Sequence, residues 1–423
     1  MKRFQRFQTA LAGFLAMGMI LAGCSASPAA SSEGSAAGSS LEASAQTASS
    51  SAEKASIIVW TNLEDETDTL QNFAEKWSQE TGNTAEVIHQ TPDLQKFAQA
   101  AQSADGPDAV FGIANDQLAS YVSAGLVQEV PDEVYNDADY SDAAVKGCYV
   151  NGKKYAVPIA VETITLFYNT DKIKSAPKTW DEMIDEAKAN GGIQFEATSI
   201  YYDLGFLRAF NGYVFNYTDD KYDAADIGLG NENAAKAYAY IQDLAVKDNF
   251  FASDITSDLA KSNFQNGQTA FYIGGPWDID GFTSANTPFA VTTMPTFNGQ
   301  NFVTPVDTQV GFVSADSKNQ AAVWDFYEYL LENAPQELYK AGGRIPASLK
   351  EQDAMNADDA TQAFITQISY GEPLPGIAEM GQVWTPYSDN MKLLLENSIT
   401  PEKAAANIQQ QVQEGIDLMN SGK

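Results

Sequence analysis

The sequence has few of the residues that build metal centres and disulfide frameworks. Its 423 residues include one histidine and two cysteines. One histidine excludes a multi-histidine metal site, and two cysteines exclude both a cysteine-ligated cluster and a disulfide scaffold. No glycine-rich loop precedes a helix in the way that phosphate-binding loops do. We therefore expect neither a metal nor a cofactor, which leaves carboxylate chemistry or ligand binding.

Positive charge is also scarce. The chain has 25 Lys and Arg against 56 Asp and Glu, which gives a formal net charge of −31. Such a charge repels the phosphates of nucleic acids and anionic lipid surfaces. We therefore expect no nucleic acid partner, whereas an uncharged ligand would meet no charge conflict.

The N-terminus has the pattern of an export signal. Lys2, Arg3 and Arg6 precede an apolar run over residues 10–22, which is too short for a stable membrane span. The run ends in Leu-Ala-Gly followed by Cys24, which resembles a bacterial lipobox. We expect residues 1–23 to be removed as a signal peptide and Cys24 to carry a lipid. An ordinary secretory signal with an incidental cysteine is the alternative.

Residues 24–56 are expected to form a lipid-anchored flexible tether. They are almost entirely Ser, Ala and Gly with a few acidic residues, and such a segment cannot bury enough apolar surface to fold. A flexible coil of about 31 residues reaches roughly 30 Å from its anchor. The interpretation is a folded body held at the extracellular face of the plasma membrane. A long tether suits a thick cell wall, so a Gram-positive host is favoured over a Gram-negative one.

The body of the chain alternates strand and helix patterns. Residues 56–60 form a short apolar run typical of a buried strand, and further strands are expected around 87–88 and 109–111. Between them, Leu70, Phe73, Ala74 and Trp77 share one helix face, and Gly82 ends that helix. This alternation predicts an α/β fold with a mostly parallel sheet covered on both faces. Ligands of such sheets bind beyond the carboxyl ends of the strands.

Later segments continue the pattern. Thr179 and Glu182 have the spacing of a capping box at the start of a helix. Further helices are expected over residues 234–246, 321–331 and 401–419, and a strand over residues 269–273. Two α/β lobes fit this series of elements.

Several aromatic residues stand in loops rather than on helix faces. Flat rings stack on the apolar faces of sugar rings, while carboxylates and amides bind the hydroxyls in the plane of the ring. Trp277 follows a Gly-Gly-Pro break, Trp384 lies in a segment interrupted by Pro and Gly, and Tyr201 and Tyr202 lie in a loop-like stretch. These residues are candidates for sugar stacking, with packing in the core as the alternative for each.

An ordered set of motifs resembles the bacterial maltose/maltodextrin-binding proteins. The set comprises NGKKYAVPIAVE at residues 151–162, PKTW at 177–180, GPW at 275–277, MPTFNGQ at 294–300 and EPLPGI at 372–377. The similarity runs from about residue 57 to residue 419. It implies a two-lobed periplasmic-binding-protein (type II) fold with three hinge crossings. The N-terminal lobe would comprise 57–160 and 313–345, and the C-terminal lobe 161–312 and 346–423.

The resemblance also implies site residues, position by position. Trp277, Tyr201 and Trp384 are similar to the stacking rings of the second lobe, with Tyr202 as the substitute for Tyr201. Three carboxylates correspond to residues that accept hydrogen bonds from the sugar, namely Glu162, Glu64 and Asp116. Several positions depart from the family pattern, which leaves the exact oligosaccharide open: Asp65, Gln117, the Gly112–Ile113 region, Ser199 and Ser388.

The resulting hypothesis is an extracellular lipoprotein without enzymatic activity. It would capture malto-oligosaccharides between its lobes, act as a monomer and deliver the sugar to the permease of an ABC transporter. Three alternatives remain at this point: an extracellular glycoside hydrolase that uses two carboxylates, a sugar-sensing subunit, and transport of a different oligosaccharide.

Overall fold

The computed structural model describes residues 54–91, 93–103, 105–218 and 221–421. The expected signal peptide, the lipidation site Cys24 and the tether up to residue 53 lie outside these residues. Within the described ranges, no helix is long and apolar enough to cross a membrane. Cys148 is a buried free thiol.

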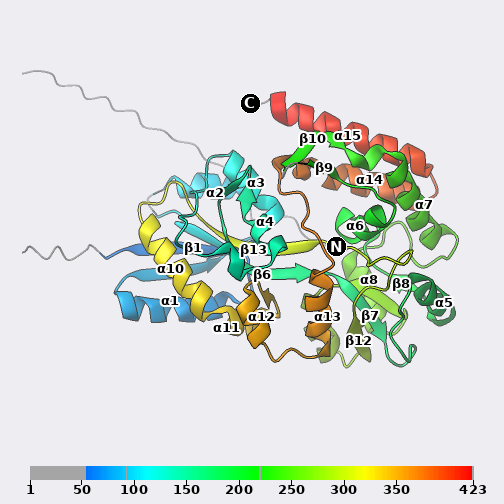
Figure 1. Ribbon diagram of the computed structural model, residues 1–423, viewed down its shortest axis with the longest axis horizontal. Helices are drawn as coiled ribbons and strands as arrows, with labels where there is room; N and C mark the ends of the chain where they lie inside the picture. Colours follow the sequence, from blue (N-terminus) through cyan, green and yellow to red (C-terminus); the bar gives the residue numbers. More distant parts are fainter. Residues whose placement is uncertain (1–53, 92, 104, 219–220, 422–423) are drawn as a thin grey trace, which may run out of the picture. The chain divides into compact units, whose positions relative to one another are not determined.

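The larger of the two main sheets has six strands in the order β14-β6-β13-β3-β1-β2 (Figure 1). β1 is parallel to both β2 and β3, but β13 is antiparallel to β3 and β6, and β14 is antiparallel to β6. The prediction of a mostly parallel sheet is therefore wrong, because β13 enters this sheet from the other lobe and runs against its neighbours. The strands are β1 (Ser56–Thr61), β2 (Thr84–His89), β3 (Ala109–Ala114), β6 (Val157–Thr163), β13 (Val306–Val313) and β14 (Ile345–Pro346).

Helices cover both faces of this sheet. One apolar core packs under α1, α10 and α11, and a second packs under α2 and α3. The helices are α1 (Thr67–Thr81), α2 (Leu94–Ala101), α3 (Asn115–Ser123), α4 (Asp142–Gly147), α10 (Gln320–Asn333) and α11 (Pro335–Gly342). A short hairpin, β4 (Tyr149–Val150) and β5 (Lys153–Lys154), follows α4.

Helix α1 illustrates how the sequence specifies the N-terminal lobe, which contains the six-stranded sheet. Its buried residues are the four predicted from their spacing: Leu70, Phe73, Ala74 and Trp77. The helix ends at Gly82, whose φ of 78° favours a residue without a side chain. Trp77 is 1% exposed, lies 5.0 Å from the ring of Phe326 and donates a hydrogen bond of 2.8 Å to Asp325. These contacts fix α1 to α10.

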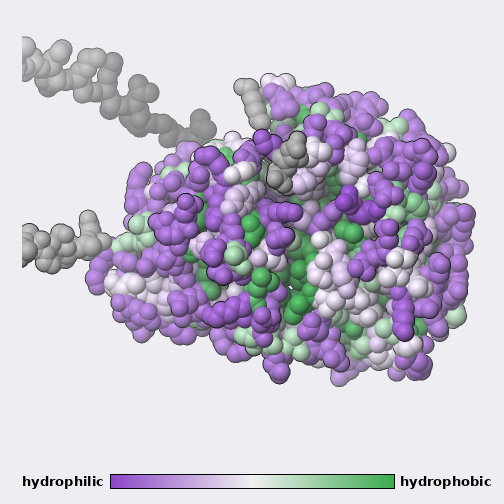
Figure 2. Space-filling view, viewed as in Figure 1, coloured by the Kyte–Doolittle hydropathy of each residue, from purple (hydrophilic) through white to green (hydrophobic). Residues whose placement is uncertain are grey.

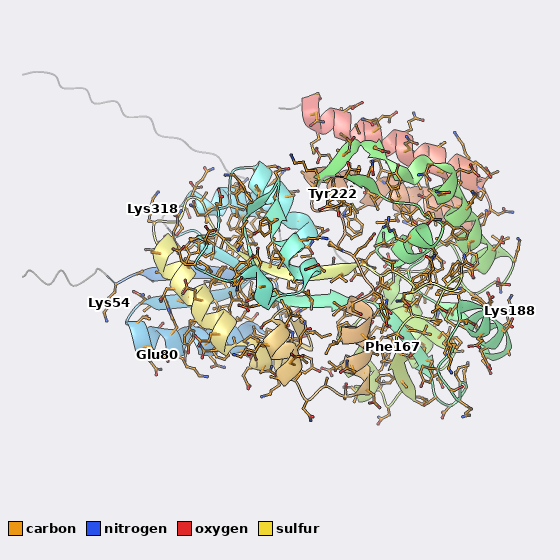
Figure 3. All side chains as sticks on the ribbon, viewed as in Figure 1. Lys54, Glu80, Phe167, Lys188, Tyr222 and Lys318 are labelled. Carbon is orange, nitrogen blue, oxygen red and sulfur yellow. The ribbon has the colours of Figure 1, made fainter. Side chains whose placement is uncertain are left out.

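The smaller sheet has four strands in the order β12-β7-β11-β8. They are β7 (Thr165–Asn169), β8 (Ile193–Gln194), β11 (Phe271–Gly274) and β12 (Phe289–Thr292). Phe167 of β7 (labelled in Figure 3) lies at the centre of a core of five other rings with centroids within 6.4 Å. This sheet and its helices form the second lobe.

Helices and a hairpin complete the second lobe. The capping box of Thr179 and Glu182 is present at the start of α5, which confirms that prediction. The helices are α5 (Trp180–Asn190), α6 (Ile200–Ala209), α7 (Glu232–Val246), α8 (Ser257–Gln265), α9 (Ile279–Ser284), α13 (Asp359–Ile368), α14 (Trp384–Leu395) and α15 (Pro401–Ser421). Helix α12 (Leu349–Ala354) instead packs against β14 and α11 of the other lobe. The hairpin is β9 (Phe215–Thr218) with β10 (Lys221–Ile227), and short 3-10 turns are η1 (Asp137–Asp139), η2 (Gly228–Gly230), η3 (Pro276–Asp278) and η4 (Ala378–Gln382).

The chain passes between the two sheets three times. It leaves the larger sheet after β6 to form β7, returns from β12 to β13, and leaves again after β14 towards α12 and α13. The expected lobe boundaries at residues 160 and 312 fall inside β6 and inside β13. Because β13 pairs with β6 from Val306 onward, residues 306–312 belong to the six-stranded sheet, whereas the sequence predicts them in the C-terminal lobe.

We expect Trp77→Ala to lower the free energy of unfolding by about 3–5 kcal/mol, because it empties a packed core site and leaves Asp325 without its indole donor. Urea denaturation followed by circular dichroism measures the change. Trp277→Ala is the matched control, since that indole is 39% exposed and should change the free energy by less than about 1 kcal/mol. Equal losses in the two variants would contradict the assignment of Trp77 to the core.

Candidate functional site

Two carboxylates occupy neighbouring positions where β6 and β13 pair. Asp307 of β13 lies opposite Glu162 of β6 in the antiparallel register. Glu162, a predicted site residue, is 5% exposed, while Asp307 is partly exposed. The pairing of these two strands thus places two acidic side chains together where the N-terminal lobe meets the other lobe.

Arg344 neutralises Glu162, one of these two carboxylates. Its guanidinium forms ion pairs with Glu162 and with Glu66, the latter with a separation of 2.8 Å between Nε and Oε1. Glu66 lies at the start of α1 and is 1% exposed. Burial raises the pKa of the Glu66 carboxyl, and the adjacent Arg344 opposes that rise. Arg344 therefore ties α1, β6 and the end of α11 together through charge.

Glu64 lies apart from this group. Its side chain is exposed in the turn before α1, two residues ahead of the buried Glu66. Glu66 therefore belongs to the group around Arg344, whereas the role of Glu64 in ligand binding stays a prediction. The first turn of a helix points successive side chains in different directions, and only Glu66 points to Arg344.

Asp116 lies in the first turn of α3, beside β13. Its Oδ1 atom is buried and has no hydrogen-bond partner among the residues that the structure describes. Burial raises the pKa of the Asp116 carboxyl, and the backbone N–H groups of Gln117 and Asp116 itself oppose the rise. Its charge also acts on Asp307, which places Asp116 close to the β6–β13 pair.

Tyr201 brings the second lobe to the same place. It lies at the start of α6, and its hydroxyl is buried without a hydrogen bond of good geometry to any described residue. Burial raises the pKa of this phenol well above its usual range, and the nearby carboxylates Asp307 and Glu162 raise it further. Tyr202 instead lies in the apolar core, 7% exposed, with its ring 5.5 Å from that of Tyr201. Tyr201, not Tyr202, therefore faces the acidic group.

Two tryptophans expose ring surface on the second lobe. Trp277 lies in η3, directly after β11, and is 39% exposed. A Cβ on Gly275 would lie 2.3 Å from its indole, so the absence of a side chain at Gly275 lets the ring fold over the backbone. Asp278 anchors this turn by accepting a hydrogen bond from Tyr272 and pairing with Lys261, each at 2.8 Å. Trp384 begins α14 and is partly buried against the core.

The structure thus brings together Glu162, Asp116 and Tyr201 from the predicted set and adds Asp307, Arg344 and Glu66. The sequence contained one signal for Asp307, a lone charge inside a run that is otherwise apolar or uncharged (residues 306–313). Arg344 and Glu66 gave no comparable signal. Within the described ranges, no group of three or more His, Cys, Asp or Glu side chains could hold a metal ion.

A cavity of about 670 Å³ lies beside this group. It is lined by Asn115 of α3, by α4, the β4–β5 hairpin, α6, the β9–β10 hairpin and residues 372–377, and by none of the predicted site residues in the described part of the chain. Tyr149, Tyr217 and Tyr222 line it (Tyr222 is labelled in Figure 3), and Arg208 pairs across it with Glu372 at 3.1 Å. Figure 2 shows that hydrophobic residues on this face gather towards its middle, while hydrophilic residues cover most of the rest.

Known proteins are similar to this chain in sequence. The family model described as bacterial extracellular solute-binding protein matches residues 68–384. A galactooligosaccharide-binding protein from Bacillus subtilis is 30% identical over 394 residues, which cover 89% of this chain and 93% of the relative. A maltooligosaccharide ABC transporter solute-binding lipoprotein from Streptococcus pneumoniae is 28% identical over 361 residues, 80% of this chain and 83% of the relative.

Solved structures agree with the sequence relatives. A cyclo/maltodextrin-binding protein complexed with maltotetraose has a TM-score of 0.80 at 26% identity, covering 87% of this chain and 98% of its own. The maltose-maltodextrin binding protein of Alicyclobacillus acidocaldarius has a TM-score of 0.77 at 29% identity, covering 85% of this chain and all of its own. The predicted two-lobed type II fold is confirmed. The relatives are binding proteins and not enzymes, which removes the glycoside hydrolase alternative.

The polar group drawn from both lobes, the two-lobed fold and the match over residues 68–384 lead to one conclusion: this chain belongs to the bacterial extracellular solute-binding protein family.

Proposed function

We propose that this protein captures malto-oligosaccharides between its two lobes and delivers them to the permease of an ABC transporter. The observation that carries the proposal is the meeting of Asp116, Tyr201 and the β6–β13 carboxylates. Asp116 belongs to the N-terminal lobe and Tyr201 to the C-terminal lobe, and each keeps a buried polar atom without a hydrogen bond of good geometry to any described residue. Buried polar groups are normally satisfied, so unpaired ones at such a place favour a polar ligand.

A neutral sugar suits these groups chemically. Its hydroxyls can donate to Asp116 and accept from the Tyr201 phenol, and hydrogen bonds to ionised acceptors are the stronger ones. The apolar ring faces of the sugar can stack on Trp277 and Trp384, whose indoles keep exposed surface. Because the ligand carries no charge, the acidic surroundings do not repel it.

Lobe closure would complete the site. We propose that the three chain crossings between the sheets act as hinges. Tyr201 and the carboxylates of the N-terminal lobe can bind one ligand together only when the lobes approach. A closed, ligand-bound form would then be the form that the permease recognises. We further propose that the protein acts as a monomer, anchored through Cys24 and its tether to the extracellular face of a Gram-positive plasma membrane. A sugar-sensing role at the same membrane is the alternative.

The choice of sugar rests on fewer residues than the choice of function. Relatives at 28–30% identity include proteins named for maltooligosaccharide and for galactooligosaccharide binding, so β-galactosides are the second candidate. The positions that depart from the maltodextrin-binding pattern, Gln117, Ser199 and Ser388, would remove charged contacts to the sugar. We therefore expect selectivity to come from residues that the family pattern does not include.

Replacing either stacking ring tests the proposed site. Trp277→Ala and Trp384→Ala should each weaken maltotetraose binding by roughly 1–3 kcal/mol, because each removes a ring that would lose its exposed surface to the sugar. Isothermal titration calorimetry measures the affinity. Tyr222→Ala is the matched control in the neighbouring cavity. If Tyr222→Ala abolishes binding while both Trp variants bind normally, the ligand occupies that cavity and the proposed site is wrong.

A ligand series tests the sugar class. We expect linear α-1,4-glucans of three or more units to bind more tightly than β-1,4-galacto-oligosaccharides of equal length. Intrinsic tryptophan fluorescence should change on binding, because Trp277 would pass from water to a sugar face. Tighter binding of the galactosides would replace the malto-oligosaccharide proposal with the second candidate.

A further inference from the structure

Asp307 is the one cleft carboxylate that no family motif assigns and no cation neutralises. Three ionisable groups from three elements face it: Asp116 from α3, Glu162 from β6 and Tyr201 from α6. Two of these are acidic, so the immediate surroundings of Asp307 are negative. Its single favourable partner is the phenol of Tyr201, which is neutral.

The nearest cations are committed elsewhere. Arg344 pairs with Glu162 and Glu66, and no ion pair joins it to Asp307 among the described residues. Helix α4 packs against β13, where Gly147 meets Thr308, but the charge of its Lys146 acts on Glu372. In the described part of the chain, Arg344 thus pairs with Glu66 and Glu162, and neither Asp116 nor Asp307 forms an ion pair.

Two ionised carboxylates side by side repel each other, so Asp116 and Asp307 do not ionise equally easily. Asp116 lies at the N-terminus of α3, where backbone N–H groups and the helix dipole stabilise its charged form. Asp307 lies in a strand whose own N–H groups are used by sheet pairing, and it has no such donors. Burial, followed by Asp116 and Glu162, raises the pKa of Asp307 well above its usual range.

We propose that Asp307 is a sugar-binding, specificity-determining residue that takes up a proton from solvent when the lobes close on the ligand. Resting on the proposed function, this inference adds a chemical state to the same site. As a carboxylic acid, Asp307 can donate a hydrogen bond to a sugar hydroxyl oxygen and accept one from a sugar O–H. Sugar capture is then coupled to protonation.

The sign of the pH dependence follows from linkage. Opening the lobes returns Asp307 to water, where it ionises at ordinary acidic pH, whereas in the closed state it stays protonated to a higher pH. The closed, liganded state therefore binds more protons, and affinity falls as pH rises between the two pKa values. A single coupled proton changes the affinity by up to about tenfold per pH unit within that window.

Calorimetry of the full chain with maltotetraose tests the inference. Titrations near pH 6 in phosphate, MES and imidazole, which have different ionisation enthalpies, give the number of protons exchanged. We expect net uptake by the wild-type protein, and lower affinity at about pH 8 than at about pH 5. Asp307→Asn should bind the sugar without proton uptake and with little pH dependence, because an amide donates and accepts as the protonated acid does. Asp307→Ala should lose about tenfold or more in affinity.

The control is Glu80→Gln, on the far end of α1 (labelled in Figure 3), which should keep the wild-type proton uptake. Sugar binding without proton uptake in the wild type, or unchanged uptake in Asp307→Asn, would overturn the inference and leave the proposed function intact. If neither α-glucans nor β-galactosides bind the wild-type protein, the proposed function fails, and this inference fails with it.

Discussion

The antiparallel pairing of β13 with β6 is the interaction on which the rest of the site depends. β13 enters the larger sheet from the second lobe and lies between β6 and β3, so one strand joins the two lobes and completes the sheet. Its register puts Asp307 opposite Glu162, and α3 and α6 add Asp116 and Tyr201. A shift by one residue would turn Asp307 to the other face of the sheet and remove it from this group.

Charge balance at this junction is set by a single arginine. Arg344 approaches two buried glutamates from a segment that follows two glycines, and Gly342 is required because a Cβ there would lie 1.8 Å from Glu66. An ion pair with buried partners contributes little net stability, but removing one member leaves an uncompensated buried charge. Arg344 therefore fixes the geometry of Glu162, and the carboxylates it does not reach keep their binding capacity for a ligand.

Family membership and ligand choice are decided by different parts of the chain. The match over residues 68–384 follows from core packing, turns and caps distributed along both lobes. Under the proposed function, selectivity would depend instead on a few side chains between the lobes, several of which differ from the maltodextrin-binding pattern. The proposed neutral, polyhydroxylated ligand would explain how a strongly acidic protein can keep acidic side chains in its site. The tyrosine-lined cavity lies beside this group, where the β9–β10 hairpin faces α4, and Asn115 of α3 also lines it.

The sequence by itself determined the local structure and the family. The buried face of α1, its end at Gly82, the capping box at Thr179 and the alternation of strands and helices all depend on residues within a few positions of one another. Such short-range rules also place Trp277 in a turn. Only the tertiary structure decided the composition of the site. Arg344 lies 278 residues from Glu66 and 182 from Glu162, and no local pattern announces such pairs. The tertiary structure also decided that Tyr201 faces the acidic group while Tyr202 packs in the core, and that Glu66 and not Glu64 pairs with Arg344. The position of Asp307 likewise follows from which side of an element faces the other lobe, a direction that packing between distant segments fixes.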